Sequence, residues 1–142
     1  MYKATQKFIK TFDDNEWKYD VIEAENNEQA DQVQTGFGAT NLTSITLNAF
    51  FDADDGPVHV RVFGLAKATD ENVDKVYKVL NELNSQNNFV RFFLDDEDKT
   101  VTVAADAVFC DDDIEEVCVG LMMAMHEICD QAYPQIMKAL WS

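Results

Sequence analysis

Two short segments around one turn constrain the fold of this chain more than any other feature. Residues 44–52 place an apolar side chain at every second position, and residues 58–62 do the same with three valines. Between them lies Asp54-Asp55-Gly56-Pro57, which is composed of residues that favour tight turns. A period of two is typical of a strand with one buried face. The sequence therefore predicts a β-hairpin whose apolar side needs a covering layer.

Other segments of the chain show weaker strand patterns or a helical period. The further predicted strands cover residues 17–25, 32–40, 89–94 and 100–106. The predicted helices cover residues 2–13, 68–86 with Thr69 or Asp70 as N-cap, 113–133 after the aspartates at 111–113, and a short closing helix from Pro134. This order predicts one α+β domain over residues 1–142. Its sheet should be mainly antiparallel, with about five to six strands and helices largely on one face.

The charge of the chain restricts its partners. Asp and Glu number 27 and Lys and Arg number 11, which gives a net charge of −16. Nucleic acids and anionic membranes attract proteins through Lys and Arg, so neither is expected as a partner. Solubility and repulsion between chains account for most of this charge, and a partner with a basic segment or mimicry of a polyanion are further possibilities that charge alone does not establish. The beginning of the chain lacks the continuous apolar stretch of a signal peptide, which predicts a cytoplasmic protein.

The cysteines and histidines do not form the spacing of a metal site. Cys110, Cys118 and Cys129 contain no C-x-x-C pair, and the residues around the Asp52 turn do not match a calcium loop. His126, Cys129 and Asp130 share one helix face, but a closed zinc site requires four ligands. Phosphate-binding glycine motifs and nucleophile motifs are also missing from the sequence. We therefore predict a protein that is not an enzyme, with no catalytic, cofactor-binding or metal-binding residues.

The long helix predicted at 113–133 has an unusually wide apolar surface. Its apolar side chains fill an arc of about 160°, and Val119, Met123 and His126 extend this arc further round the helix. Either the helix is covered on two sides within the chain, or one side binds another chain. For the second case we expect an interface that includes Val119, Met122, Met123 and His126. A homodimer through this surface is the specific prediction.

Three segments of the chain resemble one bacterial family. These are VLNELN at 79–84 followed by FVRFFLD at 89–95, AYPQIMKAL at 132–140, and TGF at 35–37. They resemble the YbjN family, which is described as sensory-transduction regulators. The resemblance implies a fold similar to type III secretion chaperones, which are small, acidic, dimeric proteins that hold unfolded segments of a partner. The family provides no established catalytic residues that could be assigned to this chain.

Three functions remain open from the sequence. The first is a non-enzymatic binding module, chaperone-like or regulatory, that engages a segment of a protein. The second is a small-molecule sensor with a pocket between the sheet and the long helix. The third is a small hydrolytic enzyme whose site forms only in three dimensions. An open apolar groove would favour the first, a deep closed pocket the second, and converging buried carboxylates the third.

Overall fold

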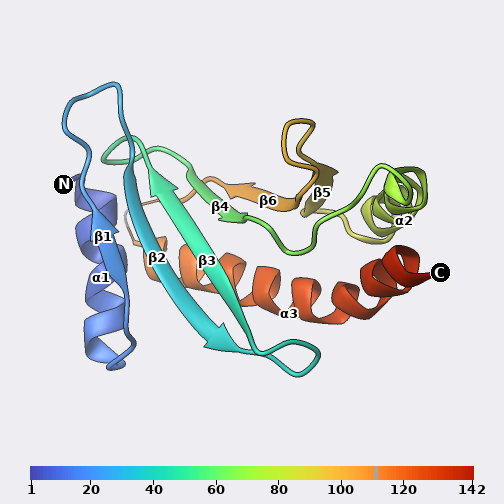
Figure 1. Cartoon of the computed structure of the whole chain (residues 1–142). Coiled ribbons are helices and arrows are strands. Elements are labelled where there is room, and N and C mark those ends of the chain that lie inside the picture. The colour runs from blue at the N-terminus through green and yellow to red at the C-terminus, as the bar shows by residue number, and fades with distance from the viewer. Residues whose placement is uncertain (111) are drawn as a thin grey trace.

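Six antiparallel strands form one twisted sheet, with three helices packed against one of its faces (Figure 1). The computed structural model describes residues 1–110 and 112–142. The strand order across the sheet is β1-β2-β3-β4-β6-β5. The elements in chain order are α1 (Lys3–Asp14), β1 (Asp20–Ile22), β2 (Asp31–Gly38), β3 (Ser44–Phe51), β4 (Val58–Val62), α2 (Val73–Gln86), β5 (Arg91–Leu94), β6 (Val101–Ala107) and α3 (Ile114–Trp141).

The predicted hairpin is confirmed as β3 and β4, in the middle of the sheet. Phe51 pairs with Val58, and Ala49 pairs with Val60. The alternating apolar side chains of both strands are buried on the helix side. The predicted α+β class, with a mainly antiparallel sheet and its helices on one face, is confirmed as well. The strand expected at residues 17–25 is shorter than predicted, because only Asp20–Ile22 pairs with β2.

Helix α3 lies across the sheet and is covered at both ends by the other helices. It contacts β3, β4 and β6, with α1 packed near its start and α2 near its end (Figure 1). Met122, Met125 and Leu47 fill the space between α3 and the sheet, and each is at most 1% exposed. This space, where the sensor hypothesis placed a pocket, is therefore occupied by the core. None of the described helices combines the length and apolar character needed to span a bilayer.

The start of the helix expected at residues 68–86 was predicted too early. Residues 69–72 form a turn, in which Val73 N donates to Thr69 O at 3.0 Å, and α2 begins only at Val73. The N-cap residue is Asn72 rather than Thr69 or Asp70, and its side chain accepts from Thr69 N at 2.7 Å. The Asn72 side chain also donates to Leu140 O at 3.2 Å. Asn72 thereby links the start of α2 to the end of α3, a contact that local sequence cannot indicate.

The break expected at Pro134 is also absent, because α3 continues without interruption to Trp141. A proline inside a helix leaves the carbonyl four residues earlier without its donor. Here that carbonyl belongs to Asp130, and the Asn41 side chain from the β2–β3 loop donates to it at 2.9 Å. Thr40 N and Asn41 N donate to the Asp130 carboxylate, at 3.1 and 2.8 Å. The docked loop thus replaces the missing helical bond.

Candidate functional site

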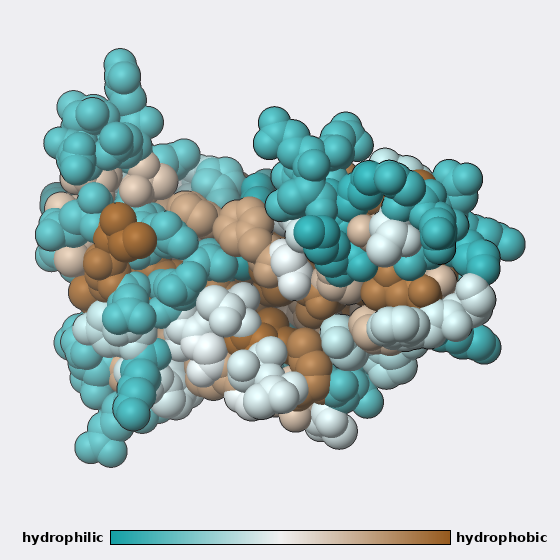
Figure 2. Space-filling model, viewed as in Figure 1, coloured by the Kyte–Doolittle hydropathy of each residue, from teal (hydrophilic) through white to brown (hydrophobic). Residues whose placement is uncertain are grey.

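Among residues 1–110 and 112–142, no helix packs on one face of the sheet, and we call this face the open face. The strand register places on it one row that crosses all six strands: Asp20, Gln34, Asn48, Arg61, Ala104 and Arg91. Both arginines of the chain belong to this row, on either side of Ala104. In Figure 2 an apolar band crosses this side of the molecule over β3 and β4, between hydrophilic ends.

Hydrogen bonds fix the polar centre of the open face. The Asn48 side-chain oxygen accepts from Gln32 at 2.9 Å and from Gln34 at 3.0 Å, and its nitrogen donates to Arg61 O at 3.3 Å. Both polar atoms of the Asn48 side chain thus have a partner, and the residue is buried although it lies on the uncovered face. A satisfied amide network of this kind holds three strands in register and leaves no reactive group free.

Charged side chains form a second cluster next to this centre. Arg61 donates to the Asp106 carboxylate at 2.8 Å, and His59 Nδ1 lies 2.9 Å from the same oxygen. The Asp52 carboxylate lies 3.6 Å from His59 Nε2. Partial burial favours a higher pKa for Asp106, but the hydrogen bonds from Arg61 and His59 outweigh it and lower the pKa. Asp106 therefore stays charged and neutralises Arg61.

Two aromatic rings and an arginine are exposed on the open face. Phe63 is 56% exposed and Phe93 is 47% exposed, and Phe93 pairs with Thr102, two residues along from the Arg91–Ala104 pair. The Phe63 ring centre lies 6.4 Å from that of Phe50. Within the described part of the chain, the side chain of Arg91 has neither a hydrogen bond nor an ion pair. The face therefore offers apolar contacts beside a cation that is free to pair with a partner.

A hollow of about 560 Å³ adjoins the open face where β1 begins. It is lined by Trp17, Lys18, Tyr19, Asp20, Gln34, Thr35, Gly36 and Thr46. Gly36 contributes to this space because it has no side chain, and a Cβ there would meet only Ile45 O at 3.8 Å. The hollow is open to solvent rather than enclosed, unlike the pockets that bury most of a small ligand.

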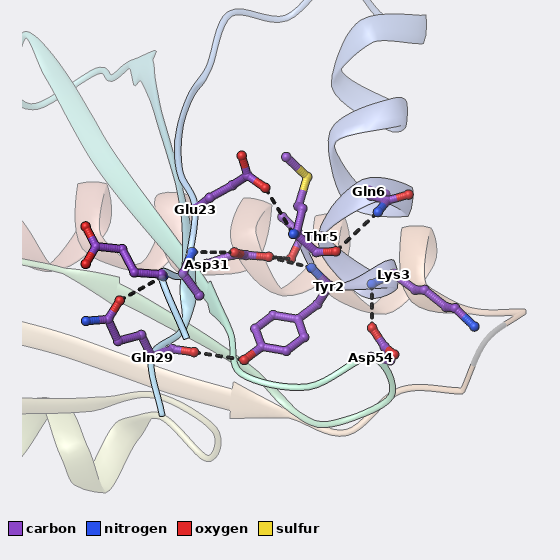
Figure 3. Close-up of polar contacts among 11 residues, drawn as sticks. Tyr2, Lys3, Thr5, Gln6, Glu23, Gln29, Asp31 and Asp54 are labelled. Carbon is purple, nitrogen blue, oxygen red and sulfur yellow. Dashed lines mark hydrogen bonds and ion pairs between the residues drawn. The ribbon is translucent and has the colours of Figure 1, made fainter. Parts of the chain in front are cut away.

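Strand β1, at one edge of the sheet, is fixed by a buried carboxylate (Figure 3). Asp31 accepts from Tyr2 N at 2.8 Å, from the Thr5 hydroxyl at 2.7 Å and from Ala24 N at 2.8 Å. Burial alone would raise the pKa of Asp31, but these three hydrogen bonds lower it below its ordinary value. Asp31 thus joins the start of α1, where a negative charge is favourable, to Ala24, two residues after β1.

Strand β5, at the other edge, is closed by a side chain from α2. The Asn84 carboxamide accepts from Phe92 N at 2.6 Å and donates to Phe92 O at 2.9 Å. It therefore makes the two bonds that a neighbouring strand would make at that residue. Asn84 lies inside α2, and Asn87 is the C-cap. Sequence reasoning missed this role, although the short distance from Asn84 to a strand with aromatic residues was visible.

The four residues predicted for an interface lie in two different environments. Met122 is 1% exposed in the core and cannot take part in a surface contact. Val119, Met123 and His126 are half-buried. His126 Nε2 lies 2.9 Å from Gly38 O, and its ring meets the edge of Phe37, so it contacts the β2–β3 hairpin. The homodimer through this helix stays a prediction.

Two of the cysteines lie buried in α3. Burial raises the pKa of both Cys118 and Cys129 to about 12, which keeps these thiols protonated. No three of the described His, Cys, Asp and Glu residues are grouped so that they could hold a metal ion. Cys129 and Asp130 lie in different environments: Cys129 is buried in the core, whereas the Asp130 carboxylate binds the β2–β3 loop.

Comparison with known proteins bears on the family and the fold of the chain. A family model named YbjN, described as "Putative bacterial sensory transduction regulator", matches residues 8–137. The chain is similar in fold to a solved structure described as "Crystal structure of YbjN, a putative transcription regulator from E. coli". The TM-score is 0.60 and the sequence identity 16%, over 91% of this chain and 87% of that chain. No curated protein matches the chain. At this identity the structural likeness concerns the fold alone.

Proposed function

The chain belongs to the YbjN family, and on that premise we propose that it is a regulatory module, not an enzyme, that binds a segment of a partner protein on its open face. The observation that carries this proposal is the pair of exposed rings, Phe63 and Phe93, beside the unpaired Arg91. Exposed aromatic residues and arginine are the residue types that most often dominate binding between proteins.

The alternatives find less support. The polar groups at the centre of the open face are paired with one another, as in the Asn48 network, whereas catalysis requires groups that can reach a substrate. The net charge of −16 disfavours nucleic acid. A protein segment needs neither a deep pocket nor a reactive group, and a chaperone-like or adaptor role fits such a surface.

The test uses an unfolded basic protein as the probe, namely reduced and alkylated ribonuclease A. We expect the wild-type protein to bind it, and the double variant Phe63→Ser/Phe93→Ser to bind about tenfold more weakly, because these rings supply most of the contact area. The matched control is Trp141→Ser, which removes an aromatic ring that is 82% exposed at the end of α3. It should leave the affinity unchanged.

Two results would contradict the proposal. One is an absence of binding by the wild-type protein, measured by fluorescence anisotropy of labelled probe at low salt. The other is equal weakening by Trp141→Ser and the double variant, which would indicate nonspecific contact with any exposed ring. Circular dichroism of each variant establishes that the sheet and helices are intact.

A further inference from the structure

The two outer strands of the sheet differ in whether their edges are occupied. An outer strand presents backbone N–H and C=O groups that can pair with another strand. At β5 the groups of Phe92 are bonded to Asn84. At β1, by contrast, no backbone group of Asp20–Ile22 bonds to any described residue outside the sheet. Figure 1 shows β1 as the outermost strand on its side, with α1 behind it.

The β1 edge also lacks three of the features that commonly protect an edge strand. Proline, a bulge or an inward-pointing charge commonly prevents pairing with another chain. Strand β1 contains no proline, pairs with β2 in an unbroken register, and carries Ile22 at 63% exposure on the open face. An aliphatic side chain so exposed beside a free edge has no evident role within the described chain, whereas a strand added to β1 would cover it.

Strand β1 is held in place at both ends, which prepares it for pairing. Two residues before it, the Thr35 hydroxyl donates to Lys18 O at 2.8 Å. Two residues after it, Ala24 N donates to Asp31 at 2.8 Å. A partner strand would therefore not have to order β1, which reduces the entropy lost on binding.

We propose that β1 is the site where an extended segment of the partner adds to the sheet as a seventh strand. This inference rests on the proposed function, because it assumes that the chain binds a protein segment. The side chains of β1 on the open face are Asp20 and Ile22, two residues apart. Opposite charges and pairs of aliphatic residues are favourable between neighbouring strands.

These two side chains define the chemistry of the partner segment. It carries a Lys or Arg opposite Asp20 and an aliphatic β-branched residue two positions away, opposite Ile22. A long basic side chain has room in the hollow of about 560 Å³ beside Asp20. The net charge of −16 favours a basic segment as well. Proline in the middle of the segment is excluded, since it cannot donate to the edge.

The test uses the capped peptide acetyl-TTKTVTT-amide, whose lysine and valine are two positions apart. Addition to β1 should slow hydrogen exchange of at least one backbone amide within residues 20–22, whereas the amides of β5 should not change. Two further peptides carry N-methyl groups on alternate residues, in the two possible registers. Only one edge of the peptide pairs with β1, so only one of these two peptides should bind.

A charge exchange tests the predicted recognition of the side chain. The variant Asp20→Lys should bind the lysine peptide about threefold more weakly than the wild-type protein does. It should bind acetyl-TTETVTT-amide about threefold more tightly than the wild-type protein does. Asp20 is exposed and makes no hydrogen bond or ion pair with its side chain among the described residues, so this variant should fold.

The outcomes separate this inference from the proposed function. If both methylated peptides bind equally well, or the β1 amides are unchanged, strand addition at β1 is wrong. Should the unfolded ribonuclease probe still depend on Phe63 and Phe93 in that case, the proposed function stands and only the inference about β1 fails. If neither the peptides nor the unfolded probe binds, both fail.

Discussion

The two outer strands of this sheet differ in how the backbone groups on their outer sides are bonded. At β5 a side chain from the preceding helix bonds to the backbone of Phe92 and takes the place of a neighbouring strand. At β1 the strand is only three residues long and is fixed at its ends, but its outer backbone groups have no partner among the residues described. The difference indicates that closing an edge is possible in this fold, and that β1 has not been closed.

The same asymmetry extends to the surfaces beside each edge. Next to β5, helix α2 packs against both the strand and α3. Next to β1, the open face carries a hollow and the exposed Ile22. Short length alone protects many edge strands, so the comparison has to be tested by changing the contacts that fix each edge.

The largest effect is expected from removing the carboxylate that fixes β1. Asp31→Ala should lower the free energy of unfolding by about 3 kcal/mol, because three donors lose their buried acceptor. The measurement is urea unfolding at pH 7. Glu28→Ala is the matched control, since it removes an equal charge at an exposed position nearby and should change little.

The pH dependence of this effect has a definite sign. The pKa of Asp31 is lowered in the folded protein, so its contribution is complete above the ordinary carboxyl pKa of about 3.9 and is lost as the pH falls through the folded-state value. The difference between wild type and Asp31→Ala should therefore shrink in acid. A difference that is constant between neutral pH and pH 3 would show that the carboxylate charge is not responsible.

A smaller effect is expected at the closed edge. Asn84→Ala should lower the free energy of unfolding by about 2 kcal/mol, since Phe92 N and O lose their partners. The Phe92 amide should also exchange faster with solvent. Asn81→Ala is the matched control, because Asn81 is exposed on the same helix and makes no side-chain hydrogen bond within the described chain. Equal results for the two variants would show that Asn84 does not close this edge.

A still smaller effect is expected at the start of β1. Thr35→Val keeps the shape of the side chain but removes the hydroxyl that binds Lys18 O, which should cost about 1 kcal/mol. The amides of β1 should then exchange faster with solvent than in the wild type. Thr46→Val, at an exposed position that pairs with Gly36, is the control. If β1 exchange is unchanged in Thr35→Val, this contact does not hold the edge.

The smallest change in stability is expected for Ile22→Thr. Ile22 is 63% exposed, so the free energy of unfolding should change by less than about 0.5 kcal/mol. Threonine retains the strand preference of a β-branched residue, but it offers less apolar area to a partner strand. The variant should therefore bind the lysine–valine peptide more weakly while remaining as stable. A loss of stability above this size would show that Ile22 packs within the chain.

The sequence predicted the elements best where a pattern was both local and regular. The alternation in residues 44–52 and 58–62 was sufficient for the central hairpin, because each side chain's face follows from its position in the strand. Phe92 and Phe93 are consecutive strand residues, so their rings lie on opposite faces of the sheet. The same alternation could therefore have predicted that one of the two rings lies on the open face. The pattern did not reveal that no helix covers this face.

The errors arose where distant residues replaced a local signal. Pro134 is a sound reason to expect a new helix, but the Asn41 side chain satisfies the carbonyl that the proline leaves free, and α3 continues. Met122 shared the apolar surface of the long helix with Val119 and Met123, yet it is buried while they are not fully covered. The width of an apolar arc does not specify which part of it faces the sheet.

The sequence by itself determined the fold class, the order of the elements and the sign of the charge, because each depends on residue type and on periods of two or about four along the chain. Only the tertiary structure decided which sheet edge is closed. That outcome depends on whether a carboxamide eight residues away meets the backbone of Phe92 at hydrogen-bond distance. Such a meeting is set by the packing of α2 against β5 and α3, which no local pattern records.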